Sequence, residues 1–170
     1  MLLDSVIENW KEVRSGFISE VSQIPENQFR FRARAETRSV TEIIQHILEA
    51  EKVFTGEVCR PDTDFARLPF HELVAEHAGD IRNAEGKDQL IEMLARNMEA
   101  TENTIRDFGE AAFQQEMRRL DGRMMSKMVF LNFAINHEMY HRGQITIYER
   151  LLHIEPALTV RVNEFLKTQS

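Results

Sequence analysis

The sequence predicts an all-α protein, a four-helix bundle with long crossover connections, and three observations lead to this fold class. Apolar residues recur at steps of three and four over four segments of about 20 residues each, which is the spacing of one buried helix face. Seven glycines and four prolines are few for 170 residues and favour helices. Two connections are too long for simple up-down-up-down wiring. We expect one domain over residues 1–170, with no β-hairpin and no glycine-rich phosphate loop.

The first two helices are expected from about Leu3 to Gln23 and from Val40 to about Val58. The basic segment Gln28–Arg38 between them has no helical period, so we expect it to run extended over the surface. Ser39 and Glu42 have the spacing of a capping box, in which the serine caps the helix and the glutamate bonds back to the serine backbone. The apolar faces of these helices consist of Leu3, Val6, Ile7, Trp10, Val13, Phe17, Ile18, Val21, Val40, Ile43, Ile47, Ala50, Phe54 and Val58.

The third helix is expected from Lys87 to Phe108, with Gly109 as its terminator. A long crossover, residues 60–86, precedes it and contains a short helix over about Pro69–Ala78. That short helix carries His71 and His77. We do not expect either histidine to bind a metal, because neither lies on a strong apolar stripe.

The fourth helix is expected from Lys127 to about His153, with Ser126 as its N-cap. Pro156 stops it, and a further short helix is expected in the tail. Gly143 lies in the middle of the fourth helix, where a glycine usually permits close approach of another helix or a ligand. The inward stripe consists of Phe130, Ala134, His137, His141, Ile145, Tyr148 and Leu152.

Two histidines on this stripe indicate a metal site. His137 and His141 are four residues apart, so on a helix both imidazoles face the same side, one turn apart. Two neutral imidazoles held in this way supply half of a tetrahedral site. His46 is the best third candidate, because it also lies within a helical face. The resulting all-imidazole site would be open on one side, and it would suit zinc, nickel, copper or iron.

The same segment also matches His137-Glu138-x-x-His141, the pattern of zinc metalloproteases in which the glutamate is the general base. This interpretation is less favoured, because it requires a further ligand downstream and a strand edge to hold an extended peptide. Glu149 is off the ligand face, and Glu155 directly precedes the helix-stopping proline. No strand is expected from the sequence.

Two segments together resemble a known family. One is Gln45-His46-Ile47-Leu48-Glu49-Ala50-Glu51 on the second helix, and the other is His137-x-x-x-His141-Arg142-Gly143-Gln144-Ile145 on the fourth. They resemble the DinB/YfiT-like superfamily, whose fold is a four-helix bundle with crossover wiring. The resemblance covers most of the chain, including the Ser39 cap. The chain departs from the family in having His153-Ile154-Glu155-Pro156 where a glycine usually precedes the proline, which alters the helix stop and leaves the ligands untouched.

The resemblance implies that His46, His137 and His141 bind a divalent metal, zinc or nickel, and that the protein forms a homodimer. It also implies a small-molecule substrate. Relatives include thiol-dependent transferases and isomerases that use bacillithiol, mycothiol or glutathione, and others are described as metal-dependent hydrolases. A metal ion would make a thiolate available in the first class and would activate water in the second. A thiol-dependent S-transferase is the favoured activity, and a hydrolase is the next.

Other residues of the fourth helix could support the site. Gln144, three residues after His141, could hydrogen-bond a ligand or a metal-bound group. Glu138 is either a general base or a solvent-facing charge, and helical geometry favours the second. Tyr140 and Arg142 are also off the stripe and are expected to pack against the segment Gln28–Arg38.

The composition excludes several classes of function. The net charge of −7 argues against binding to a nucleic acid, and the arginines near residues 30–38 and 118–123 are expected to be solvated loop charges. The sequence contains neither a signal peptide nor an apolar run long enough to span a membrane, so we expect a cytoplasmic protein. The lone cysteine, Cys59, is expected to be a small buried apolar group.

Three hypotheses therefore remain open from the sequence. The first is a metal-dependent enzyme with a three-histidine site. The second is a non-enzymatic metal-binding or stress-response bundle protein that keeps the site for stability or sensing. The third is a bundle whose histidines are core residues only.

Overall fold

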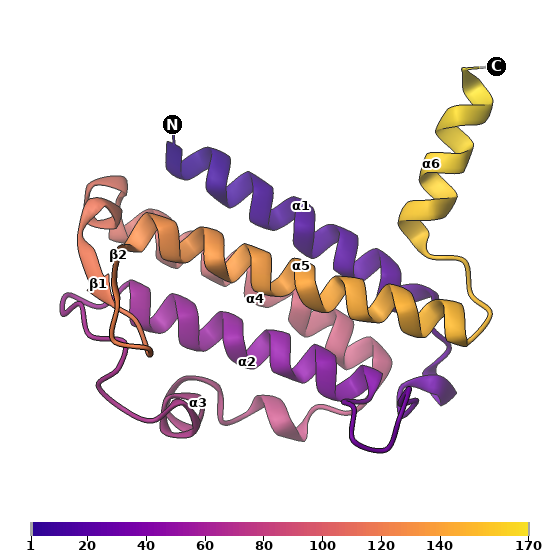
Figure 1. The fold of residues 1–170 in the computed structure, drawn as a ribbon, viewed down its shortest axis with the longest axis horizontal. Coiled ribbons are helices and arrows are strands. Elements are labelled where there is room, and N and C mark those ends of the chain that lie inside the picture. The colour runs from indigo at the N-terminus through magenta and orange to yellow at the C-terminus, as the bar shows by residue number, and fades with distance from the viewer. Residues whose placement is uncertain (1, 170) are drawn as a thin grey trace.

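A computed structural model describes residues 2–169 and confirms the all-α fold (Figure 1). Four long helices form the bundle: α1 (Leu2–Gln23), α2 (Val40–Val58), α4 (Lys87–Phe108) and α5 (Lys127–Leu151). The shorter elements are the helices α3 (Phe70–Ala78) and α6 (Ala157–Thr168), the 3₁₀ turns η1 (Glu26–Gln28), η2 (Ile81–Asn83) and η3 (Glu110–Gln114), and the strands β1 (Glu116–Arg118) and β2 (Met124–Ser126).

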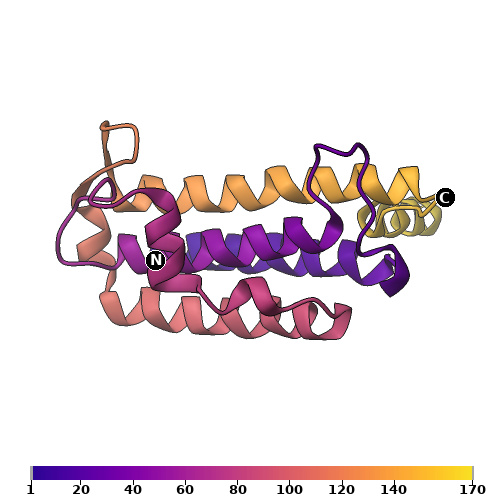
Figure 2. The ribbon, with the colours of Figure 1, turned by 90° about the horizontal axis from the view of Figure 1, so that it is seen from below.

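The bundle has the crossover wiring that the long connections predict. α1 and α2 each pack against both α4 and α5. α1 and α5 run in one direction, and α2 and α4 run in the other (Figures 1 and 2). Because α2 and α4 are parallel, the chain must return along the whole bundle between them, and residues 59–86 with α3 make that return. α2 and α5 are therefore neighbours although they are far apart in the sequence.

The predicted helix starts are confirmed by their caps. Ser39 Oγ accepts from the amide of Glu42 at 3.2 Å, and Glu42 Oε2 accepts from the amide of Ser39 at 2.7 Å. Ser126 Oγ accepts from the amide of Val129 at 3.2 Å at the start of α5. Each cap satisfies donors that the first helical turn leaves unpaired and stabilises the helix by about 1 kcal/mol.

The end of α5 shows how this helix stops without a glycine at its C-terminus. His153 adopts a left-handed conformation with φ 61°. The amide of Ile154 donates to the carbonyl of Glu149 at 2.8 Å, and the amide of His153 donates to that of Arg150 at 3.1 Å. This is the hydrogen-bond pattern of a left-handed helix stop. A histidine in this conformation costs about 1 kcal/mol relative to glycine.

The expectation of no β-hairpin was wrong. β1 and β2 form an antiparallel pair in which Met117 lies opposite Met125, and Gly122 in the turn has a φ of 81°. Asp64 of the crossover forms a further isolated bridge with Arg118. Each strand has three residues, which is too short for an alternating apolar pattern to be recognised in the sequence.

The close approach of another helix, which was one of the two roles expected of Gly143, does not occur. Apart from its chain neighbours and the backbone of its own helix, no atom lies within 4 Å of where its Cβ would stand. The close approach occurs instead at Gly16 of α1, where a Cβ would stand 2.1 Å from a guanidinium nitrogen of Arg142. Arg142 therefore crosses α1 to reach Glu20 at 2.8 Å, and does not pack against residues 28–38 as expected.

Two features at the margins of the bundle complete the fold. The predicted tail helix is present as α6, which stands away from the bundle and has no buried residue (Figure 1).

Cys59 is half-buried at the end of α2, and burial raises the pKa of its thiol to about 11, so the group stays protonated at neutral pH. Among residues 2–169, no helix is long and apolar enough to cross a membrane.

Candidate metal centre

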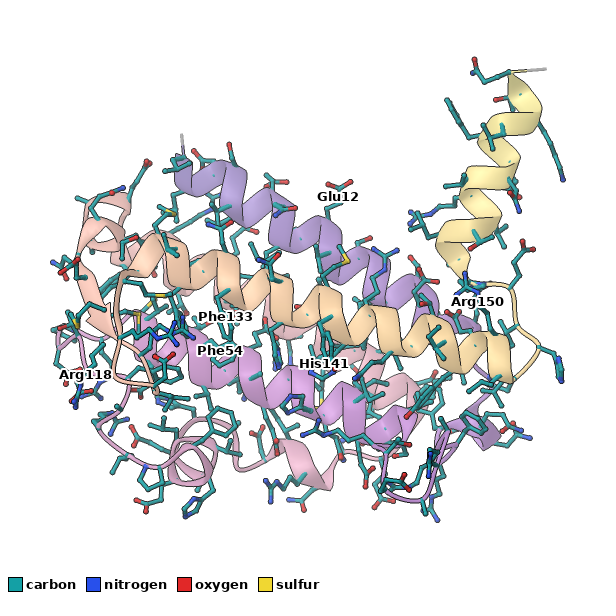
Figure 3. The ribbon with its side chains drawn as sticks, in the orientation of Figure 1. Glu12, Phe54, Arg118, Phe133, His141 and Arg150 are labelled. Atoms are coloured by element: carbon teal, nitrogen blue, oxygen red, sulfur yellow. The ribbon has the colours of Figure 1, made fainter. Side chains whose placement is uncertain are left out.

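The three predicted histidines converge between α2 and α5. His46 comes from α2, and His137 and His141 come from consecutive turns of α5. His137 Nε2 lies 3.1 Å from His46 Nε2 and 3.2 Å from His141 Nε2. The rings of His46 and His141 are 4.7 Å apart between centroids. Figure 3 shows His141 pointing from α5 toward α2.

The imidazoles are neutral at pH 7. Burial, aided by the positive charge of Arg38 and by the neighbouring imidazoles, lowers the pKa of His46 to about 3. Burial and the His141 ring lower the pKa of His137 to about 4. Burial also lowers the pKa of His141, against the effect of its hydrogen bond to Gln144. Neutral imidazole is the form that binds a metal.

A fourth side chain orients His141. Gln144 Oε1 lies 2.8 Å from His141 Nδ1. A carbonyl oxygen can only accept, so the proton of His141 is on Nδ1 and the lone pair of Nε2 faces the other two histidines. A hydrogen bond of this kind fixes the tautomer and ring orientation of a metal-binding histidine. Gln144 was expected to bond a ligand or a metal-bound group, and in the structure it bonds His141 itself.

The donor set fits a divalent ion. Nitrogens about 2.0–2.1 Å from a tetrahedral zinc ion are about 3.3–3.4 Å from one another. The two Nε2 separations at His137, 3.1 and 3.2 Å, are close to that value. A single proton on His137 Nε2 could satisfy only one of its two neighbours, whereas a cation would satisfy all three lone pairs. Three protein ligands also leave a coordination position open, as in catalytic sites.

Aromatic rings lie beside the histidines. The Phe54 ring lies 5.5 Å from that of His137 and 5.9 Å from that of Phe133, and the Tyr140 ring lies 5.2 Å from that of His141. Tyr140 is 65% exposed and contacts His141, whereas it was expected to pack against residues 28–38. Phe54 and Phe133 lie on the side of His141 nearest the hairpin (Figure 3).

The expectation that Glu138 faces solvent was wrong. Its side chain is 2% exposed and points toward α1. Glu138 Oε1 accepts from Arg14 Nε at 2.5 Å, and Oε2 accepts from Trp10 Nε1 at 2.8 Å and from Arg14 at 3.0 Å. Arg14 also reaches Glu51 of α2 at 3.0 Å. Because α5 is covered by both α1 and α2, two of its faces are buried, and a single apolar stripe does not reveal the second face.

The geometry gives no support to the protease interpretation. In a metalloprotease of this pattern, the glutamate serves as a base at the metal. Here both oxygens of Glu138 are bonded to α1 side chains. Glu149 lies near the C-terminal end of α5, beyond the histidines. It is fully buried and accepts a hydrogen bond from Gln23.

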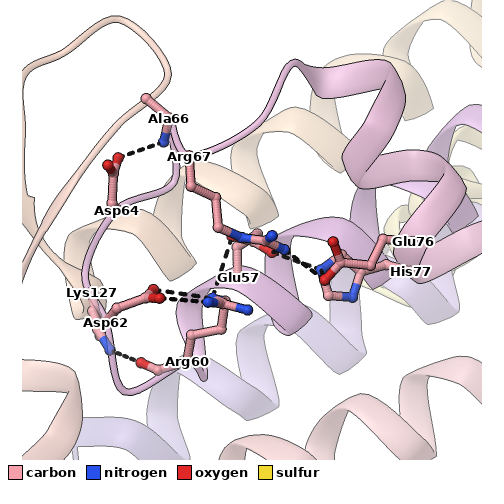
Figure 4. Close-up of polar contacts among 9 residues, drawn as sticks. All are labelled: Glu57, Arg60, Asp62, Asp64, Ala66, Arg67, Glu76, His77 and Lys127. Carbon is pink, nitrogen blue, oxygen red and sulfur yellow. Dashed lines mark hydrogen bonds and ion pairs between the residues drawn. The ribbon is translucent and has the colours of Figure 1, made fainter.

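A second cluster of candidate ligands was missed by the sequence analysis. Glu57, Glu76 and His77 bring one potential ligand atom each to within 4.8 Å of one another. Arg67 lies among them, 2.6 Å from Glu57 and 2.7 Å from Glu76, and His77 Nε2 lies 2.7 Å from Glu57 (Figure 4). The guanidinium occupies the position that a cation would take. No apolar periodicity marks these residues, so the sequence carries no signal for them.

The residues and fold described so far match one known family over nearly the whole chain. The DinB family profile matches residues 2–169. The chain belongs to the DinB family. No curated protein shows significant sequence similarity to it.

Solved structures show the same fold at low sequence identity. A structure of YfiT from Bacillus subtilis, described as a probable metal-dependent hydrolase with an unusual four-helix bundle topology, is 16% identical, with a TM-score of 0.70 over 90% of this chain and 89% of that one. A DinB-like protein from Bacillus subtilis is 15% identical, with a TM-score of 0.68 over 88% and 92%. A mycothiol-dependent maleylpyruvate isomerase is 14% identical, with a TM-score of 0.67 over 84% of this chain and 60% of its own.

Proposed function

We propose that this DinB-family protein binds one divalent metal ion through His46, His137 and His141 and uses it in an enzymatic reaction on a small molecule. The observation that carries the proposal is the convergence of three neutral imidazole nitrogens from two helices, with separations of 3.1 and 3.2 Å. Zinc and nickel are the metals that we favour. When bound, such an ion lowers the pKa of a coordinated thiol or water molecule, which supplies a nucleophile near neutral pH.

The side chains of this chain would prepare the site for that chemistry. Gln144 holds the Nδ1 proton of His141, so that the Nε2 lone pair faces inward. Phe54 and Tyr140 would supply apolar surface beside the histidines. The pair of Glu138 and Arg14 anchors α5 to α1 at the residue that follows His137. None of these groups is a free base, so the metal-bound nucleophile would itself be the reactive group.

The favoured reaction is S-transfer from a low-molecular-weight thiol, and hydrolysis is the next candidate. A structural relative that depends on mycothiol supports the first, and one described as a probable hydrolase supports the second. The test is turnover of an electrophile such as 1-chloro-2,4-dinitrobenzene by the metal-loaded protein with bacillithiol, mycothiol or glutathione. Turnover with one thiol that His141→Ala abolishes would support S-transfer. Metal binding without turnover of thiol or ester substrates would support the non-enzymatic alternative.

The metal itself is tested by elemental analysis of protein purified without added metal. We expect about one ion per chain. Gln144→Leu should weaken metal affinity by about 10–100-fold, because loss of a hydrogen bond to a ligating histidine typically costs that much. Protein that carries no metal, and that gains none on dialysis against zinc or nickel, would contradict the proposal.

A homodimer also remains a prediction. Four apolar side chains of α6 lie on one exposed face, namely Leu158, Val162, Phe165 and Leu166. Sedimentation of the wild type and of Phe165→Glu would show whether the chain dimerises and whether this face takes part.

A further inference from the structure

Arg38 lies at the edge of the histidine cluster, in a backbone segment whose position is fixed by contacts with two helices. It is the last residue before Ser39, the cap of α2. Its carbonyl accepts a hydrogen bond from the hydroxyl of Tyr148 on α5 at 2.7 Å. The ring of Tyr148 meets that of Phe31 edge-on at 5.5 Å. The segment therefore contacts both helices that carry the histidines, and these contacts define the position of the Arg38 backbone.

Two cavities meet at this arginine. One, of about 540 Å³, extends from Arg38 to Gln45 and His46 on α2. The other, of about 670 Å³, extends from Arg38 to Gln144 and Tyr148 on α5. Glu36, Thr37 and Arg38 line both. A small molecule that reaches the histidines from either side would therefore pass Arg38.

Most charged side chains around these cavities already have partners. Arg32 pairs with Glu42 at 2.5 Å, and Arg82 pairs with Glu49 at 2.8 Å. Glu36, which lines both cavities, pairs with Arg34 at 2.7 Å. Within residues 2–169, the guanidinium of Arg38 has no carboxylate at ion-pair distance and no hydrogen-bond acceptor.

The positive charge of Arg38 lies near the histidine cluster, because Arg38 and His46 line the same cavity. A positive charge beside a site for a cation opposes the binding of that cation. An anion between Arg38 and the metal ion would offset this repulsion.

We propose that Arg38 binds the carboxylate of a small-molecule ligand whose other end reaches the three histidines. The inference rests on the proposed metal site and names the ligand class. A guanidinium binds a carboxylate with two parallel hydrogen bonds. Only one positive charge here lacks a partner, while Glu36, Glu42 and Glu49 line the same cavity. A singly charged carboxylate therefore suits the position better than a phosphate dianion.

The experiment uses the cobalt(II)-loaded protein, whose thiolate-to-cobalt absorption band reports thiol binding without any turnover. Three mercapto acids (2-mercaptoacetate, 3-mercaptopropionate and 4-mercaptobutanoate) are each compared with the mercapto alcohol of the same length. The acid-to-alcohol affinity ratio is measured in the wild type and in Arg38→Gln, so that differences in intrinsic thiol pKa cancel. At one chain length or more, we expect the ratio to fall about tenfold in Arg38→Gln.

Matched variants separate the specific contact from general charge. Arg30→Gln removes an exposed arginine of the same basic segment that is paired with Glu85 and lines neither cavity, so it should leave the ratio unchanged. Arg38→Lys keeps the charge without the two-pronged geometry and should retain part of the preference. The affinity for each alcohol measures any general effect of a substitution on thiolate binding, and the ratio removes that effect.

The outcomes distinguish this inference from the proposed function. If cobalt and the alcohols bind but the ratio is equal in wild type and Arg38→Gln at every chain length, the carboxylate site is overturned and the metal site stands. An equal fall in Arg30→Gln would also overturn it, because the effect would then be general charge. If cobalt does not bind, both proposals fail together.

Discussion

Two clusters in this molecule offer three metal-type ligands each, and they differ in what lies among those ligands. In the first, His46, His137 and His141 face one another with no cationic group between them. In the second, Glu57, Glu76 and His77 surround the guanidinium of Arg67 (Figure 4). The negative charge of the second cluster is thus balanced by an arginine of the chain itself. The cluster connects α3 and the crossover to α2.

The difference shows that ligand type and proximity do not by themselves define a metal site. Carboxylates buried near a histidine need a positive charge, and an arginine meets that need without any ion. Neutral imidazoles carry no charge to be balanced, so their convergence has no such internal explanation. The absence of a resident cation, more than the number of ligands, is what sets the histidine cluster apart.

The largest expected effect is on metal content. His46→Ala should lower zinc affinity by at least about 100-fold, because it removes one of three ligands. His77→Ala should retain the wild-type metal content. Elemental analysis and competition with a chromophoric chelator would measure both. Equal loss of metal from the two variants would contradict the conclusion that only the histidine cluster binds a metal.

The next effect comes from removing the internal cation. Arg67→Ala leaves the fully buried side chain of Glu57 without its main partner, so the thermal unfolding midpoint should fall by several degrees. Made in the His46→Ala background, the same change should create a zinc-dependent rise in that midpoint, because the guanidinium that lies among the three ligands is then gone. His46→Ala alone should show no such rise. A zinc response that is the same with and without Arg67 would mean that the guanidinium does not block the second cluster.

A smaller effect on stability is expected when either of two glycines is replaced by alanine. A Cβ on Gly56 would stand 2.5 Å from His77 Nδ1, so Gly56→Ala should displace the ring and destabilise the protein by about 1–3 kcal/mol. Gly143 lies between His141 and Gln144 but meets nothing within 4 Å, so Gly143→Ala should stabilise α5 by up to about 1 kcal/mol. Urea unfolding of both variants is the measurement. Neither should change metal content, and a stable Gly56→Ala would show that the packing of His77 on α2 is dispensable.

A further effect is a dependence of stability on pH in the metal-free protein. The folded state keeps His46 and His137 neutral, with pKa values of about 3 and 4, whereas an unfolded chain protonates them near 6.5. Below pH 6.5 the unfolded state therefore binds more protons, so stability should fall as the pH falls from about 6.5 toward 4. Urea unfolding in chelator at several pH values would show this. The double variant His46→Gln with His137→Gln should flatten the decline, and an unchanged slope would mean that other groups cause it.

The sequence by itself determined the four long helices, both serine caps and the placement of His137 and His141 on one face. These features depend on contacts within about four residues, which periodicity and capping patterns record directly. The place of His46 on a helical face made it the third candidate, and the family resemblance pointed to the same residue. The hairpin was missed because three-residue strands carry too short a pattern.

Only the tertiary structure decided the contacts between distant segments. His46 and His137 are 91 residues apart in the chain, and Glu138 and Trp10 are 128 apart. The direction of Glu138, the guanidinium among Glu57, Glu76 and His77, and the unpaired Arg38 each depend on which helices become neighbours. A local pattern shows that a residue is on a buried or exposed face, but it does not show which group that face will meet, because the packing of the whole bundle sets that choice.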